Sequence, residues 1–195
     1  MNYVLNSVIF MTAKKILSEI LEKIYYASSW SIILYIVVTT GIYMGIVILI
    51  EAYLNEKKKK FISYALNVSI IVYVIIILLV TLVSRNVQMS REISIVPFSY
   101  LDSQDKIRGN LMNILLFYPL GILSGTKWKK KRCILSGTFM SLVIEISQYF
   151  WNLGYAEVDD VINNTIGMAL GVSVMLVFEK FYLHYNKDKN GYEDE

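Results

Sequence analysis

The sequence predicts an all-α fold, a polytopic membrane bundle of about five transmembrane helices preceded by an amphipathic or interfacial helix at the N-terminus. Hydrophobic residues make up 55% of the 195-residue chain, more than the roughly 45–50% of soluble domains. They are concentrated in long runs without a charged residue, and basic residues fall in short segments between those runs. Both features are typical of proteins that cross a membrane several times.

Two runs are long enough to cross a bilayer without interruption. Residues 30–50 and 61–83 contain no Asp, Glu, Lys or Arg, and each exceeds the ~18–20 apolar residues that a hydrocarbon core of about 30 Å requires. Three further runs, residues 109–126, 133–151 and 161–178, are shorter or contain polar residues. We therefore expect five transmembrane helices.

Residues 1–29 are expected to form an N-terminal amphipathic segment. Isoleucine and leucine recur between residues 16 and 24 at spacings of three and four, with Lys and Glu between them, which is the pattern of a helix with one apolar face. Such a helix can lie along the membrane surface or pack on the bundle, and both alternatives remain open. The transmembrane bundle then covers residues 30–183. Residues 184–195 form a polar cytoplasmic tail, in which 186–195 are expected to be disordered.

Composition excludes several functions. Cys133 is the only cysteine, so the chain can form neither an intramolecular disulfide nor a CxxC metal or redox site. The formal net charge is +3, but the basic residues flank apolar runs, which membrane topology explains better than nucleic-acid binding. We therefore predict membrane lipids as partners, and neither a nucleic acid, a cofactor nor a metal site.

Basic loops set the predicted orientation. Residues 57–60 are all lysine, and residues 127–132 hold five basic residues and no acid. Both loops are predicted to be cytoplasmic, because short cytoplasmic loops are enriched in Lys and Arg. Residues 152–160 carry three acids and no basic residue. This loop and, by alternation, residues 84–108 are predicted to be extracytoplasmic.

Small and polar residues line one face of the fourth predicted span. Gly137, Ser141, Glu145, Gln148 and Asn152 recur at spacings of 3 and 4, so they share a helical face that must contact protein or water instead of lipid. Glu145 lies roughly 9 Å inside the outer boundary, at ~1.5 Å per residue from the end of the span. A carboxylate at that depth is energetically expensive. Glu145 is therefore a candidate functional residue, whereas Gly137 and Ser141 are expected to serve helix packing.

A second polar face begins the fifth predicted span. Asp160, Asn164, Gly167 and Gly171 share a face through spacings of 4, 3 and 4. Asp159 and Asp160 suit a helix N-terminus, where acids meet free N–H groups and the positive end of the helix dipole. They can therefore serve as structural caps or belong to a site. Gly167 and Gly171 form a G-x-x-x-G pair, which predicts a helix-packing seam.

The predicted outer loop supplies basic residues. Arg85 and Arg91 precede an apolar stretch at residues 93–98, and such a loop is expected to rest against the membrane surface. Either arginine can pair with a buried acid, bind a lipid phosphate through its planar guanidinium, or lie at the interface. Asn110 and Asn113 follow on the outer turn of the third span. The predicted ligand-binding cluster at the extracytoplasmic helix ends therefore contains Arg85, Arg91, Asn110, Asn113, Glu145, Gln148, Asp159, Asp160 and Asn164.

Several of these motifs, taken in order and spacing, resemble a known family. They are Arg85 with Val96-Pro97-Phe98, Asn110-x-x-Asn113-x-x-x-x-x-Pro119-x-Gly121, Glu145-x-x-Gln148, and Asp159-Asp160-x-x-x-Asn164-Thr165-x-Gly167-x-x-x-Gly171. Together they resemble the VanZ family over about residues 80–175.

The resemblance implies a small multi-pass protein of the bacterial cytoplasmic membrane. The founding member of the family is associated with teicoplanin resistance without an altered cell-wall precursor, so the resemblance implies a role against lipoglycopeptides. A lipid-linked cell-wall precursor or an acylated antibiotic is then the expected ligand. Many relatives carry an arginine and an aspartate shortly before the paired aspartates, where this sequence has Tyr155 and Glu157. A role that depends on that arginine does not carry over.

Three functions remain open at this point. The favoured one is a non-enzymatic envelope protein whose outer cluster binds a lipid headgroup or an acylated ligand. The second is a membrane-embedded enzyme acting on a lipid-linked substrate, with Glu145 as general acid or base and Asp160 orienting water or a metal. No residue is assigned as catalytic, and these two are the candidates. The third is a small transporter, since buried acids often mark proton relays.

Overall fold

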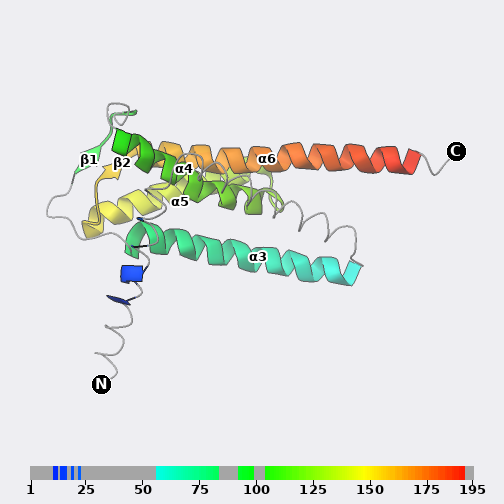
Figure 1. Cartoon of the computed structure of the whole chain (residues 1–195), viewed down its shortest axis with the longest axis horizontal. Coiled ribbons are helices and arrows are strands. Elements are labelled where there is room, and N and C mark those ends of the chain that lie inside the picture. The colour runs from blue at the N-terminus through cyan, green and yellow to red at the C-terminus, as the bar shows by residue number, and fades with distance from the viewer. Residues whose placement is uncertain are drawn as a thin grey trace, which may run out of the picture. The chain divides into compact units, whose positions relative to one another are not determined.

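The structure is a computed structural model, and it describes residues 11, 12, 14–16, 19, 22, 56–83, 92–98 and 104–191. The chain divides into two compact units, Met1–Asn86 and Val87–Glu195, and each is described by itself. Figure 1 shows their helices and strands. The first predicted span, residues 30–50, lies outside the described residues, as does most of the predicted N-terminal segment, residues 1–29.

In the first unit, α3 covers Glu56–Leu78 and continues as the π-helical turn η1, Leu79–Val83. It begins at Glu56, so the lysines at residues 57–60, predicted as a loop, instead form the start of the helix. Neither glycine nor proline interrupts the uncharged stretch that follows. The segment Ser63–Val83 is long and apolar enough to cross a membrane, as predicted for residues 61–83. Near its end the buried hydroxyl of Thr81 donates to the Ile77 carbonyl at 2.8 Å. This polar group is therefore satisfied within its own helix.

The described part of the second unit contains three long helices and two short strands, in the order β1, α4, α5, β2 and α6. The helices are α4, Gln104–Gly125, α5, Lys130–Trp151, and α6, Val158–Gly191. The strands β1, Ile93–Ser94, and β2, Ala156–Glu157, pair in parallel. The helices cover the positions of the third, fourth and fifth predicted spans.

Within the described residues, three helices are long and apolar enough to cross a membrane: Ser63–Val83, Lys130–Trp151 and Val158–Phe181. The helix α4 is not among them, since its first half carries Arg108, Asn110 and Asn113. The total of five transmembrane helices therefore remains a prediction.

The helices α4 and α6 run in parallel with their backbones in direct contact. Along α4, Ile114 and Tyr118 meet Gly167 and Gly171 of α6 in the same order, and a side-chain carbon on either glycine would collide with the carbonyl oxygen of its partner. A carbon on Gly121 of α4 would likewise collide with the backbone of α6. The packing seam predicted from the G-x-x-x-G pair is confirmed, because only glycine permits this approach.

The helix α5 runs antiparallel to α6, since a short turn at residues 126–129 reverses the chain after α4. Gly137 faces Met168, whose Cγ would lie 2.8 Å from an added side-chain carbon. One turn further along α5, Ser141 meets Asn164, one turn earlier on α6. The small face predicted for this helix therefore packs against α6, as expected for Gly137 and Ser141.

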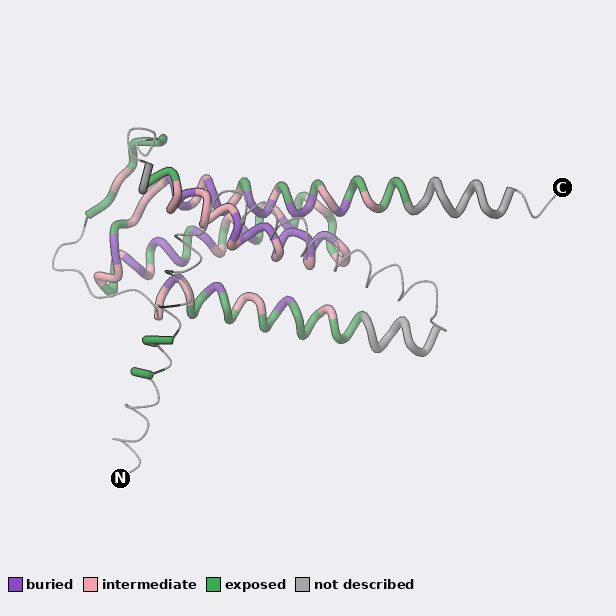
Figure 2. Tube along the Cα trace, viewed as in Figure 1, coloured by how far each residue is buried: buried purple, intermediate pink, exposed green. Residues whose placement is uncertain are grey.

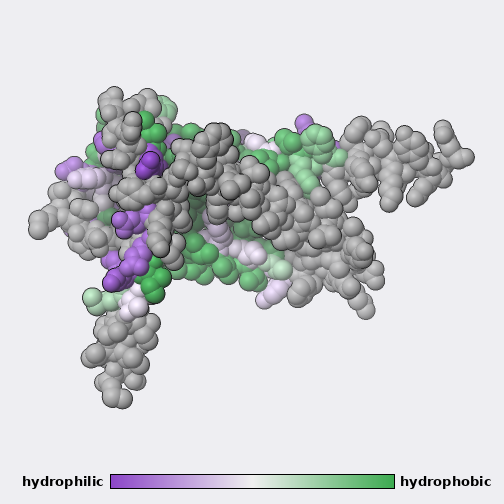
Figure 3. Space-filling view, in the orientation of Figure 1, coloured by the Kyte–Doolittle hydropathy of each residue, from purple (hydrophilic) through white to green (hydrophobic). Residues whose placement is uncertain are grey.

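The buried faces of these three helices contain the core of the second unit, and Figure 2 shows them as recurring purple stretches. Fully buried residues include Phe117, Ile144 and Met168. Large hydrophobic residues remain exposed on other faces, such as Phe139, which is 68% exposed, and Figure 3 shows hydrophobic residues on the surface of the described helices. A helix that is apolar on its outer face as well as its inner face is typical of a membrane span.

The last helix extends further than predicted. No glycine or proline occurs between Val172 and Asn190, so each added residue extends the hydrogen-bonded helix at little cost once it has started. The helix α6 therefore reaches Gly191. The expectation of disorder from residue 186 is wrong as far as residue 191.

Candidate functional site

The predicted site residues that the structure describes lie at one end of the second unit. Here α4 and α6 begin, α5 ends, and β1 and β2 pair (Figure 1); we call it the polar end. The helix α5 stops at Asn152, which adopts a left-handed conformation with φ 53°, and the N–H of Leu153 donates to the Gln148 carbonyl at 2.9 Å. Gly154, with φ 147°, completes the reversal into β2. Asn152 therefore acts as a helix C-cap.

Amide side chains connect α4 to α6 at this end. The Asn113 amide donates to Oδ1 of Asp160 at 2.6 Å. The Asn163 amide donates to Oδ1 of Asn110 and, at 2.8 Å, to the carbonyl of Asp159. The earlier asparagine on α4 meets the later residue on α6 and the later asparagine meets the earlier residue, so the two side-chain contacts cross between the helices. The result is a pair of contacts between buried or half-buried polar groups that stabilise each other.

A second set of polar contacts joins α5 to α6 and β2. The Asn164 amide donates to the Ser141 hydroxyl at 2.8 Å, and Glu145 Oε2 accepts the backbone N–H of Glu157 at 3.1 Å. Gln148 is fully buried on the same face of α5. The face predicted from the spacing of these residues is therefore real, and Glu145 is only 5% exposed.

A third contact connects the polar end to the segment before α4. Asp159 Oδ1 accepts the backbone N–H of Phe98 at 2.6 Å. Phe98 has φ 60°, a conformation that is unfavourable for a bulky residue by about 1–3 kcal/mol. The strand pair adds a bond from the Ala156 N–H to the Glu92 carbonyl at 3.1 Å. Residues 92–98 are thus bonded to β2 at one end and to the start of α6 at the other.

The acids at this end are buried and accept hydrogen bonds. Asp159 is 2% exposed and Asp160 is 8% exposed, and both lie in the first turn of α6. Negative charge there is stabilised by the free N–H groups and the dipole of the helix. The predicted capping role and membership of the cluster are therefore compatible. Among the described residues, no group of three or more His, Cys, Asp or Glu side chains is placed to hold a metal ion.

The structure extends the predicted cluster as well as locating it. The predicted Arg85 and Arg91 lie outside the described residues. Asn163, which is 2% exposed and contacts two elements of the site, was not predicted. It lies four residues after Asp159, and this spacing on one helix face was the available signal. The backbone donors of Phe98 and Glu157 left no signal in the sequence, because they depend on how the loops fold back.

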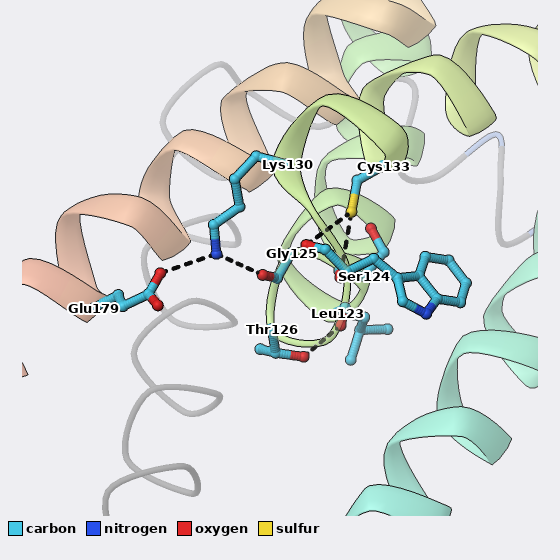
Figure 4. A network of polar contacts seen from close by, with 8 residues as sticks. Leu123, Ser124, Gly125, Thr126, Lys130, Cys133 and Glu179 are labelled. Carbon is cyan, nitrogen blue, oxygen red and sulfur yellow. Dashed lines mark hydrogen bonds and ion pairs between the residues drawn. The ribbon is translucent and has the colours of Figure 1, made fainter.

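The opposite end of the second unit, which contains residues 126–132 and which we call the basic end, is held differently. Lys130 forms an ion pair with Glu179 at 2.9 Å and donates to the Gly125 carbonyl at 2.8 Å (Figure 4). The buried thiol of Cys133 donates to the Ser124 carbonyl at 3.4 Å. Apart from the ion pair, these side chains bond to nearby backbone, so they join consecutive parts of the chain.

These observations define a class of protein: a helical membrane protein with a buried polar cluster at one end of a three-helix unit. The VanZ/LLP1 family model matches residues 68–179, more than half of the sequence, and the chain belongs to this family. The family resemblance found from the motifs is confirmed.

One characterised relative is the protein VanZ of Enterococcus faecium, which is 28% identical to this chain over 102 residues. The match covers 51% of this chain and 60% of VanZ, so the chain spans less than two thirds of that relative. No solved structure matches the chain.

Proposed function

We propose that this chain is a multi-pass protein of the bacterial cytoplasmic membrane that reduces the action of acylated glycopeptides such as teicoplanin. The observation that carries the proposal is the polar end, where three helices of a VanZ-family protein place buried amide and carboxylate side chains in one cluster. Buried polar groups at membrane depth are expensive, and they commonly mark a functional site.

The charge distribution supports an extracytoplasmic position for this cluster. The five basic residues of 127–132 lie at the basic end, opposite the polar end. Cytoplasmic loops are enriched in Lys and Arg, so the basic end faces the cytoplasm. The polar end then faces the side on which glycopeptides act.

The chemistry of the cluster favours binding a lipid headgroup, a lipid-linked cell-wall precursor or an acylated antibiotic. An acyl chain holds such a ligand in the outer leaflet, beside the ends of the helices, and raises its effective concentration there. Amide and carboxylate groups such as Asn113 and Asp160 offer donors and acceptors to hydroxyl, amide and amine groups.

The proposal predicts selective protection. Expression in a susceptible host should raise tolerance to teicoplanin more than tolerance to vancomycin, which has no acyl chain. Asp160→Ala should lose the difference, because it removes the carboxylate that Asn113 contacts. The matched control is Ser173→Ala on the same helix, an exposed residue whose hydroxyl bonds to its own helix at Ala169. It should protect as well as the parent chain.

Membrane abundance of each variant is measured by immunoblot, so that loss of protein is separated from loss of function. Equal protection against both antibiotics, or none from the parent chain, would contradict the proposal. So would full protection by Asp160→Ala at parental abundance.

A second candidate is a membrane-embedded enzyme that uses Glu145 as general acid or base and Asp160 to orient water. The burial of both carboxylates at the polar end favours this candidate, because a carboxyl group removed from water can serve as a general acid or base. Glu145→Gln separates the two candidates. Its amide oxygen can still accept the Glu157 N–H but cannot exchange a proton at neutral pH. Retention of protection supports binding, and complete loss at parental abundance supports catalysis.

A further inference from the structure

The segment 92–98, which we call the apolar loop, exposes large hydrophobic side chains. Ile95 is 71% exposed, Val96 is 63% exposed, and Ile93 and Phe98 are each more than half exposed. Single exposed apolar residues are normal on a protein surface, but several close together mark an interaction site. The loop has four such residues within six positions.

Other exposed apolar side chains also occur at the polar end. Trp151 ends α5 and is 61% exposed, and Tyr155, next to the strand that pairs with β1, is 42% exposed. Trp and Tyr are enriched where membrane meets water. Exposed apolar side chains therefore occur both on the loop and at the end of α5, one of the helices long enough to cross a membrane.

Two buried carboxylates hold the loop through backbone bonds. Asp159 accepts the N–H of Phe98 at the end of the loop. Glu145 accepts the N–H of Glu157 on β2, and β2 pairs with β1 inside the loop. Neither bond needs a particular side chain on the loop, so the two acids set its backbone position and leave its apolar side chains directed outward.

We propose that the apolar loop inserts into the outer leaflet at the interface between headgroups and acyl chains, and that Asp159 and Glu145 are positioning residues for this membrane anchor. Lipid is the occupant because four of the loop's seven residues are exposed large hydrophobics and because the loop pairs with β2, which follows the end of the apolar helix α5. The anchor fixes the depth of the polar end, and it does not depend on the antibiotic-related function proposed above.

The test uses the full chain with Cys133→Ser, which removes the single native thiol. Ile95→Cys is labelled with bimane, and the protein is reconstituted into phosphatidylcholine–phosphatidylglycerol vesicles. We expect quenching by lipids that carry a nitroxide near the headgroup, and little quenching by iodide supplied on both sides. Lys129→Cys in the exposed turn of the basic end is the control, and it should show the reverse pattern.

The positioning role is tested in the same labelled chain. Asp159→Ala should shift the Ile95 label toward iodide, whereas Asp159→Asn should not, because its amide oxygen still accepts the Phe98 N–H. Asp160→Ala is the matched control, since Asp160 is the neighbouring buried acid and its carboxylate accepts a hydrogen bond from Asn113 of α4. Helical content by circular dichroism identifies variants that fail to fold. If Asp159→Ala fails to fold, Glu145→Ala is used in its place.

Three results would overturn the proposal. An Ile95 label that iodide quenches as strongly as the Lys129 label places the loop in water. Protection from both quenchers places it against protein, as in contact with a second copy. Equal shifts in Asp159→Ala and Asp160→Ala show a general loosening of the polar end instead of a positioning role.

Discussion

The two ends of the second unit are built from the same three helices but are held together in different ways. At the polar end, side chains bond from one helix to another, as Asn113 does to Asp160 and Asn164 to Ser141. At the basic end, side chains bond mostly to nearby backbone, as Ser124 does to the Leu120 carbonyl. The ion pair between Lys130 and Glu179 there involves a Glu179 side chain that is 55% exposed.

The difference shows which end of the unit requires one arrangement of the helices and which end tolerates several. A buried donor or acceptor that loses its partner on another helix stays desolvated, whereas an exposed group can turn to water. The polar end therefore requires one arrangement of the three helices. The basic end requires only that the chain reverse and that apolar residues pack.

The largest effect is expected at the seam between α4 and α6, which connects the polar end to the basic end. Gly171→Leu should destabilise the chain by about 3 kcal/mol or more, since overpacking costs ~1–3 kcal/mol even where side chains can move, and here the obstacle is the backbone of Tyr118 and Gly121. The measurement is thermal unfolding in detergent, together with the yield of folded protein. Gly109→Ala, which meets nothing within 4 Å, should not lower the unfolding temperature. Equal unfolding temperatures for the two variants would refute the seam.

An intermediate effect is expected at the polar end alone. Asn163→Ala leaves buried Asn110 without its partner, and an unsatisfied buried group costs about 1–3 kcal/mol. A double-mutant cycle with Asn110→Ala should show coupling, because the second substitution removes the group that the first left unsatisfied. Additive losses in unfolding free energy would show that the two amides do not interact.

The smallest effect is expected at the basic end. Glu179→Gln removes the ion pair with Lys130, and partly exposed pairs contribute less than ~1 kcal/mol. The shift in unfolding temperature should be the smallest of the three and should vanish at high salt. A loss as large as that of Asn163→Ala would overturn the contrast between the ends.

The positions of the long described helices α3, α4, α5 and α6 could be predicted approximately from the sequence, because each corresponds to a run of mainly apolar residues. The buried face of Gly137, Ser141, Glu145 and Gln148 could also be predicted, since helical spacing fixes which residues share a face. Each of these inferences is local, and each depends on one element at a time.

What could not be predicted depends on contacts between elements. The Asn163 amide bridges α6 to α4, and this contact depends on how the two helices pack against each other. The bond from Phe98 to Asp159 joins residues 61 positions apart. The apolar stretch at 93–98 suggested a membrane-surface loop, but nothing in the sequence indicated which acids hold it.

The direct contact between α4 and α6 has a consequence for biosynthesis. The first half of α4 carries Asn110 and Asn113, and both find their partners on α6. During translation α4 is complete at residue 125, whereas α6 begins only at Val158. Until α6 is made, the two asparagine amides and the surface around Gly121 on α4 have no helix packed against them. As a separate helix, α4 is therefore poorly suited to partition into lipid. We expect the insertion machinery to retain α4 until α6 arrives and the two helices leave together.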